Sequence, residues 1–169
     1  MIHSLLTSLD KKMHFKTASA HCDIPCKIYD PSTAQICALT MIRMVDLIEE
    51  INAKEKATVE DRFQLVRLIA EKESHGVKLK EEIRIIWGDY FKQPKIDKYP
   101  DIHRLVHNIM MQGSKVKQGV SQAEGLKLLA LVNEFATIFW ETKGVAVHTA
   151  ICPYPPSQAV VYPTLEAVS

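Results

Sequence analysis

Proline placement limits the folds open to this chain more than any other feature of its sequence. No proline stands between Pro31 and Pro94, nor between Pro100 and Pro153, so two long stretches are free to form uninterrupted helices. Asp30 before Pro31 predicts a helix start, because aspartate caps helix N-termini and proline suits the first helical position. Apolar residues then recur three or four positions apart, as on one face of a helix: Cys37, Met41, Met44, Ile48 and Ile51.

A second helix is predicted from near Thr58, with Asp61 as its capping-box partner. It passes Gly76, which is a candidate position for a break or a kink. The positions predicted to face inward are Phe63, Val66, Ala70, Leu79, Ile83, Ile86 and Tyr90.

Two more helices follow a linker at 92–101, whose prolines exclude a continuous helix. The third begins near Asp101 and ends before a predicted loop at 112–119, and Ser121 and Glu124 form a capping box that opens the fourth. The inward positions are Ile102, Val106 and Ile109 in the third helix and Leu128, Val132, Phe135 and Phe139 in the fourth. Four amphipathic helices with short connections predict an all-α, antiparallel four-helix bundle.

The composition excludes several classes of partner. With 169 residues, 47% of them hydrophobic, the chain can bury the core of one compact domain. Its net charge of +1 and its lack of a basic stripe argue against nucleic acid, and it has no apolar run long enough to span a bilayer. The segment 145–169 has one charged side chain and four prolines. It is predicted to be an irregular C-terminal extension that lies on the bundle or on a neighbouring subunit, with disorder as the alternative.

Residues 17–31, TASAHCDIPCKIYDP, concentrate the candidate metal ligands of the chain. Cys22 and Cys26 can supply thiolates, which suit zinc, copper(I), iron–sulfur clusters or nickel. A zinc site needs a second pair of ligands, which His103 and His107 can offer from one helix face, although ordinary structural histidines are the simpler interpretation. A thioredoxin-like redox pair is excluded, because such a pair has two intervening residues and a βαβ context.

The first 20 residues are predicted to be a leader that is removed on maturation. Their apolar segment, 2–9, is short and broken by polar residues, and Lys11 and Lys12 follow it rather than precede it, so the pattern of an export signal is incomplete. The Ala-Ser-Ala sequence at 18–20 fits a small-residue cleavage site. Removal inside the cell is favoured over export. The four cysteines are too few for a disulfide scaffold, so a cytoplasmic protein is predicted.

Cleavage between Ala20 and His21 would give the chain a new metal ligand. The free α-amine of His21 has an ordinary pKa of roughly 7.7–8.0, so it is partly unprotonated near neutral pH. This amine and the amide nitrogen of Cys22 close one five-membered chelate ring, and the same nitrogen and the Cys22 thiolate close another. Cys26, turned back at Pro25, adds a second thiolate. Two nitrogens and two sulfurs in a plane favour nickel(II) or copper(II), with the His21 imidazole as an axial ligand.

Three blocks of the sequence carry a family resemblance. They are HCDIPCKIYDP at 21–31, WGDYFKQPKIDKYPDIHRLV at 87–106 and IFWETK at 138–143. In this order they resemble the nickel-containing superoxide dismutases, whose N-terminal motif is H-C-D-x-P-C-x-x-Y-D-P. The resemblance spans about 21–144. It implies a four-helix bundle that assembles as a homohexamer, a removed leader, a nickel ion as cofactor, and the conversion of superoxide to oxygen and hydrogen peroxide.

The resemblance also implies roles for the residues of the N-terminal hook, 21–29. His21 supplies the amine and the axial imidazole, Cys22 the amide nitrogen and a thiolate, and Cys26 the second thiolate. The other matches are a hook-stabilising aspartate, a cis proline, the tyrosine beside the open axial face and a further tyrosine packed near the site: Asp23, Pro25, Tyr29 and Tyr90.

Two positions depart from the family pattern beside the axial ligand. The family's glutamate, which hydrogen-bonds the imidazole, falls here on Cys37, and its arginine partner falls on His75. His75 can substitute as a donor or acceptor to His21, whereas Cys37, on the core face of the first helix, is more simply a buried thiol. Such changes typically cost about 10–100-fold in metal affinity or activity. The alternative functions are therefore a nickel-binding bundle without turnover and a structural oligomer with an incidental disulfide.

Superoxide is an anion, and two protons are consumed for each peroxide that leaves. Lys27 or Lys92 can help the anion approach, although solvated surface lysines are the simpler interpretation. Tyr29, a hook amide or a protonated thiol is the candidate proton donor, and the sequence does not choose among them. The predicted partners are superoxide, a leader-processing protease and further copies of the chain, without nucleic acid or membrane.

Overall fold

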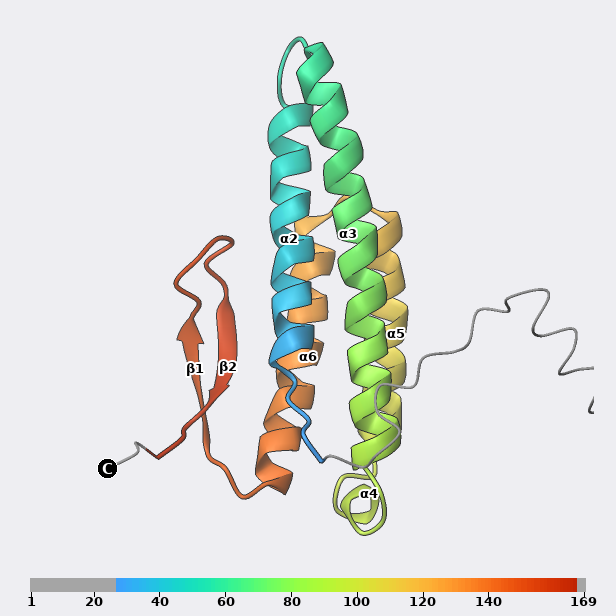
Figure 1. Cartoon of the computed structure of the whole chain (residues 1–169), viewed down its shortest axis with the longest axis vertical. Coiled ribbons are helices and arrows are strands. Elements are labelled where there is room, and N and C mark those ends of the chain that lie inside the picture. Colours follow the sequence, from blue (N-terminus) through green and yellow to red (C-terminus); the bar gives the residue numbers. More distant parts are fainter. Residues whose placement is uncertain (1–26, 167–169) are drawn as a thin grey trace, which may run out of the picture.

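The structure is a computed structural model of the chain, and it describes residues 27–166. Four long helices pack side by side, and a two-stranded hairpin lies against them (Figure 1). In chain order the elements are α2 (Ser32–Asn52), α3 (Val59–Ile85), the π-helical turn η1 (Ile86–Tyr90), α4 (Lys95–Lys98), α5 (Ile102–Gln118), α6 (Gln122–Thr142), β1 (Val147–Ile151) and β2 (Ala159–Pro163). The predicted antiparallel four-helix bundle is confirmed, and the strands are an addition to it.

Helix α2 begins within one residue of its predicted start. The Asp30 carboxylate accepts a hydrogen bond from the Ser32 backbone N–H at 2.7 Å, and in this way caps one of the helix's unpaired donors. Among the predicted inward positions Met44 is half-buried, and the others are buried: Cys37, Met41, Ile48 and Ile51.

Helix α3 departs from the prediction in its first half. Its capping box is confirmed, but Phe63 and Val66 are 72% and 67% exposed and Ala70 is exposed too, so these inward assignments are wrong. The buried stripe includes Asp61, which completes the capping box, and Lys72, which binds backbone carbonyls of α5. Because charged residues occupy the inward stripe, apolar spacing alone indicates the wrong face here.

The contact between α3 and α5 explains two further differences from the prediction. Helix α3 passes Gly76 without a break, and this glycine admits the stem of Lys117, whose Cγ would overlap a β-carbon at position 76. Helix α5 stays helical through most of the predicted loop. The Lys72 ammonium donates to the carbonyls of Val116 at 2.8 Å and Gly119 at 2.9 Å, and to that of Lys117. It thus satisfies helix-end carbonyls that lack intrahelical partners.

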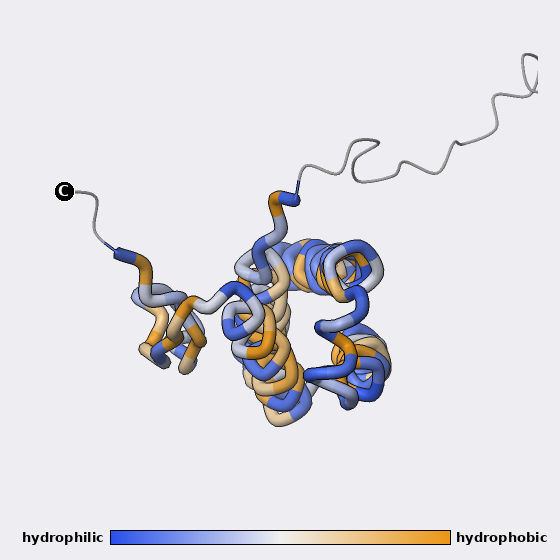
Figure 2. The backbone as a smooth tube through the Cα atoms, turned by 90° about the horizontal axis from the view of Figure 1, so that it is seen from below, coloured by the Kyte–Doolittle hydropathy of each residue, from blue (hydrophilic) through white to orange (hydrophobic). Residues whose placement is uncertain are grey.

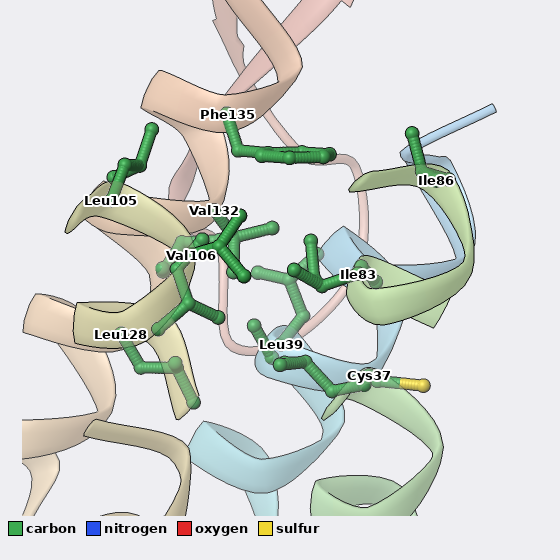
Figure 3. Packing of buried hydrophobic residues seen from close by; sticks show 14 of the residues in the cluster. Cys37, Leu39, Ile83, Ile86, Leu105, Val106, Leu128, Val132 and Phe135 are labelled. Carbon is green, nitrogen blue, oxygen red and sulfur yellow. The ribbon is translucent and has the colours of Figure 1, made fainter. Parts of the chain in front are cut away.

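The core follows the axis of the bundle, where the apolar faces of the helices meet (Figure 2). Ile83 of α3, Val106 of α5 and Val132 of α6 lie close to one another in it (Figure 3). Full burial of one such side chain contributes about 1.5–3 kcal/mol. The inward predictions for α5 and α6 are confirmed at Ile102, Val106, Ile109, Leu128, Val132, Phe135 and Phe139.

The C-terminal extension forms a β-hairpin, so the prediction of an irregular or disordered arm is wrong. Its strands pair antiparallel, with Thr149 opposite Val161. The prediction that it lies on the bundle is confirmed. Gln35 Nε2 of α2 donates to the Val161 carbonyl at 2.8 Å, and Asn133 Nδ2 of α6 donates to the Ala159 carbonyl at 3.0 Å. None of the four prolines of the segment interrupts a strand, because three of them lie between β1 and β2 and the fourth is the last residue of β2.

Helices α2 and α3 extend beyond the far ends of α5 and α6 (Figure 1). Their projecting part has its own small buried cluster of Ile48, Ile51 and Leu68, separate from the main core. Within residues 27–166, no helix is both long and apolar enough to cross a membrane.

Candidate metal centre

The residues predicted to bind metal lie outside the described part of the chain. These are His21, Cys22 and Cys26, together with their neighbours Asp23 and Pro25. Of the other predicted site residues, the structure describes Tyr29, Cys37, His75 and Tyr90.

Tyr29 and Tyr90 lie together at the end of the bundle where α2 starts. Their ring centroids are 5.8 Å apart, and the planes are tilted by 51°. Tyr90 also packs against Phe91 and Phe139, with centroids 5.3 and 4.9 Å away. Both tyrosines, which the sequence placed in separate blocks, thus share one aromatic cluster.

Hydrogen bonding fixes the orientation of the Tyr90 hydroxyl. Its oxygen lies 2.7 Å from Oγ1 of Thr142, and that oxygen lies 2.6 Å from the Phe139 carbonyl. The threonine has one hydroxyl proton, which it donates to the carbonyl, since a carbonyl can only accept. The Tyr90 hydroxyl is therefore the donor to Thr142.

Two lysines that the sequence reasoning did not select flank the Tyr90 ring. Nζ of Lys95 lies 4.3 Å from the ring centroid, and Nζ of Lys143 lies 4.9 Å from it. Cations at these distances are attracted to the negative face of an aromatic ring. Lys143 belongs to the closing sequence block, but only the fold brings it to Tyr90. Of the lysines that were selected, Lys92 donates to the Gly88 carbonyl at 2.5 Å and Lys27 is exposed.

Cys37 is a buried thiol, as its position on the core face predicted. It is 1% exposed, and its sulfur points away from the centre of the core cluster (Figure 3). Burial raises the pKa of this thiol above its ordinary value of 9.0, while Lys78 opposes that shift and Glu82 adds to it. Cys37 is therefore a neutral thiol at physiological pH.

His75 lies away from the tyrosine cluster. Its Nδ1 is 2.9 Å from the carbonyl of Glu71, one turn earlier on the same helix. It stands seven residues before Glu82, which is about 10 Å along a helix axis. The structure therefore does not bring His75 to the end of the bundle that carries Tyr29.

A cavity of about 400 Å³ opens beside Tyr29, between the start of α2 and the end of α3. Asp30 and Thr33 line it from one side, and Glu82 and Ile85 line it from the other. Glu82 is a half-buried carboxylate that sequence reasoning did not select. A carboxylate on a charged stretch of helix gives no signal in the sequence, because its position is set by how α3 packs on α2.

The zinc alternative receives no support from the helices. His103 Nδ1 accepts a hydrogen bond from Trp87 Nε1 at 3.0 Å, and the two rings meet edge to face. His103 thus has a structural contact. Among residues 27–166, no three or more histidine, cysteine, aspartate or glutamate side chains are grouped so that they could hold a metal ion.

Comparison with known proteins extends over the bundle and the hook. A family model described as nickel-containing superoxide dismutase matches residues 16–143. A nickel superoxide dismutase of Streptomyces coelicolor is 35% identical over 127 residues, which cover 75% of this chain and 91% of that protein. One from Streptomyces seoulensis is 36% identical over 125 residues, covering 74% and 89%. The native nickel superoxide dismutase structure at 1.30 Å has a TM-score of 0.62 and 32% identity, covering 73% of this chain and 99% of that chain.

Proposed function

The chain belongs to the nickel-containing superoxide dismutase family, and from this membership we propose that it converts superoxide to oxygen and hydrogen peroxide at a nickel ion held by its N-terminal hook. The observation that carries the proposal is the family match over residues 16–143, which includes His21, Cys22 and Cys26. The fold of the described residues agrees with it, since related solved structures align over nearly their whole length.

The donor set of the hook fits nickel. Two thiolates, an amide nitrogen and an amine would form a donor set of nitrogen and soft sulfur, which suits nickel better than the cations that prefer oxygen ligands. His21 would hold the ion through its amine and imidazole, Cys22 through its amide nitrogen and sulfur, and Cys26 through its sulfur. Nickel bound in this way supplies a one-electron couple between Ni(II) and Ni(III), which disproportionation of superoxide requires.

In this proposal, residues of the described bundle position the site and supply positive charge near it. Tyr29 and Tyr90 form an aromatic wall at the end of the bundle from which the hook departs, and the bond from Tyr90 to Thr142 keeps that wall in one orientation. Lys95 and Lys143 stand over Tyr90, so two cations raise the local concentration of an anionic substrate. Protons for peroxide come from Tyr29, a hook amide or a protonated thiol.

Maturation and assembly are part of the same proposal. Removal of residues 1–20 would free the α-amine of His21 in the cytoplasm, and the mature chain would form a homohexamer. The segment 145–169 is then a C-terminal extension that follows the family region.

A nickel-binding protein without turnover is the second candidate. Two observations favour it: Cys37 is a buried neutral thiol, and His75 lies away from Tyr29. In this second candidate neither residue supports the His21 imidazole, whereas the resemblance implies a glutamate and an arginine in that role.

The test is superoxide turnover by nickel-loaded protein that begins at His21, compared with protein that begins at Ala20. We expect activity in the His21 form alone, because an added residue converts the amine into a peptide nitrogen. Equal activity in both forms would refute the amine as a ligand. Nickel binding without turnover in the His21 form would favour the second candidate.

A further inference from the structure

The hairpin of β1 and β2 follows the region that matches the family, residues 16–143, and its two edges differ. Strand β2 lies between β1 and the bundle (Figure 1), and side chains of the bundle bind the backbone groups that β2 turns away from β1. Gln35 Nε2 donates to the Val161 carbonyl at 2.8 Å, and Asn133 Nδ2 donates to the Ala159 carbonyl at 3.0 Å. The Val161 N–H in turn donates to Asn133 Oδ1 at 3.3 Å. The bundle therefore closes the edge of β2.

The edge of β1 is open. The Cys152 N–H donates to the Gln158 carbonyl at 2.9 Å, so these two residues form a hydrogen-bonded pair of the hairpin. Bonded and non-bonded pairs alternate along an antiparallel ladder, and therefore Val147, Thr149 and Ile151 direct their N–H and C=O groups away from β2. None of these outward groups has a hydrogen-bond partner within residues 27–166.

Strand β1 lacks the features that ordinarily protect such an edge. Proteins block open edges with lysine, proline or a covering segment, because a row of unpaired backbone groups is a template for another strand. Strand β1 contains neither a proline nor a charged residue. Its outward positions carry the β-branched residues Val147, Thr149 and Ile151, which suit strand pairing, and the Ile151 side chain is 63% exposed. The edge is therefore able to accept a further strand.

A second copy of the same strand fits this edge. We propose that β1 pairs antiparallel with β1 of a second copy of the chain, about a two-fold axis at Thr149, so that two hairpins form one four-stranded sheet. Thr149 then faces Thr149 of the second copy, and Val147 faces Ile151, so that three pairs of residues each exchange two hydrogen bonds. Threonine pairs and pairs of β-branched residues are favourable across strands. His148 faces Ala150, so the two copies of this histidine are not directly opposite each other.

Charge and space favour a copy of the chain over a charged peptide as the occupant. The segment 145–169 has one charged side chain, outside β1, so the edge offers a charged partner nothing to bind and opposes no like charges when it pairs with itself. The hairpin stands on one side of the bundle (Figure 2), and β2 separates β1 from the bundle. The two bundles would therefore lie on opposite sides of the shared sheet. A two-fold contact of this kind is closed, so it joins copies in pairs.

The test uses amide hydrogen exchange, measured residue by residue in the full chain. The outward N–H of Ile151 should exchange slowly only when a second strand is paired, whereas the N–H of Ala150 is bonded within the hairpin and reports its integrity. We expect slow exchange at both positions in the wild type. Thr149→Lys and Thr149→Glu each place two like charges opposite each other and should abolish the protection of Ile151 alone. An equal mixture of these two variants should restore it, because the lysine of one copy then faces the glutamate of the other.

Two further variants separate charge from structure. Thr149→Gln is the matched control, since it has a polar side chain of similar length without charge, and it should behave as the wild type. Thr149→Pro disrupts the pair by a second route, because the N–H at position 149 points away from β2 and the hairpin does not need it. It should remove the protection of Ile151 and leave that of Ala150.

Each contrary result overturns the inference. Fast exchange of Ile151 in the wild type would mean that the edge stays open. Slow exchange in Thr149→Lys, Thr149→Glu and Thr149→Pro would mean that another segment covers it. Loss of protection without recovery in the mixture would mean that the partner is not a second β1. The inference does not depend on the proposed function, since β1 carries no predicted metal ligand and the test needs no nickel.

Discussion

Replacement of Lys72 by methionine gives the sharpest test of how the bundle is held together. Lys72 is 2% exposed, and its ammonium donates to three backbone carbonyls at the end of α5, two of them at 2.8 and 2.9 Å. Methionine replaces the apolar stem of lysine up to Cε but lacks the ammonium, and so leaves those carbonyls without a donor. An unsatisfied buried polar group costs about 1–3 kcal/mol, and part of the loss is offset because a charge no longer has to be buried.

The net expectation is a loss of about 2–4 kcal/mol in the free energy of unfolding. For a domain of this size, that lowers the thermal midpoint by roughly 5–15 °C. Chemical and thermal unfolding would be measured for Lys72→Met, with Lys78→Met, at an exposed position of the same helix, as the control. A change below about 0.5 kcal/mol would refute the argument, since that is the range of ordinary surface substitutions.

The pH dependence of the same variant gives an independent check. Burial lowers the pKa of Lys72 below its ordinary value of 10.5. Between the folded and unfolded pKa values, the native state has released a proton that the unfolded state still binds, so this residue adds stability as the pH rises. The difference in unfolding free energy between the wild type and Lys72→Met should therefore widen toward pH 10.5. A constant difference would contradict the lowered pKa.

Three further predictions concern other parts of the bundle. Hydrogen bonds from Lys54 and Thr58 lower the pKa of Asp61 to about 2, so its contribution to stability is present above its ordinary pKa of 3.8 and is lost as the pH falls through 2. Acid unfolding followed by circular dichroism should show a shallower loss between pH 4 and 2 in Asp61→Asn. Gly125→Ala should cost about 1–3 kcal/mol in denaturant unfolding, because its β-carbon would stand 2.8 Å from an isoleucine atom of α2. Tyr90→Phe removes the bond to the Thr142 hydroxyl and should cost about 0.5–1.5 kcal/mol in thermal unfolding, while the ring contacts persist.

The helices could be predicted from the sequence because local signals and packing agree there. The helices predicted in the proline-free stretches begin within a residue or two of their predicted starts, and the capping box of Thr58 and Asp61 is present. The prediction of the inward face of α3 failed because a charged side chain is buried there in place of an apolar one. Lys72 occupies the inward face of α3 and donates hydrogen bonds to carbonyls at the end of α5, and neither position nor contact follows from hydrophobic spacing.

The hairpin was missed for a different reason. Its prolines indicate irregular backbone, yet β2 accepts hydrogen bonds from Gln35 and Asn133, which lie far away in the sequence. The candidate site, too, depends in part on contacts between residues that are far apart in the sequence. Tyr29 and Tyr90 were selected from their motifs, whereas Lys95 and Glu82 acquire their positions only through the packing of helix ends.

The projecting part of α2 and α3 has a consequence for motion. Only a small cluster of Ile48, Ile51 and Leu68 closes it, whereas the end that carries Tyr29 and Tyr90 belongs to the main core. Local opening is least costly where few apolar contacts must separate. Backbone amides should therefore exchange with solvent first near the turn between these two helices, and last in the middle of the bundle. The projecting end of α2 and α3 can therefore open locally while the tyrosine cluster at the other end keeps its geometry.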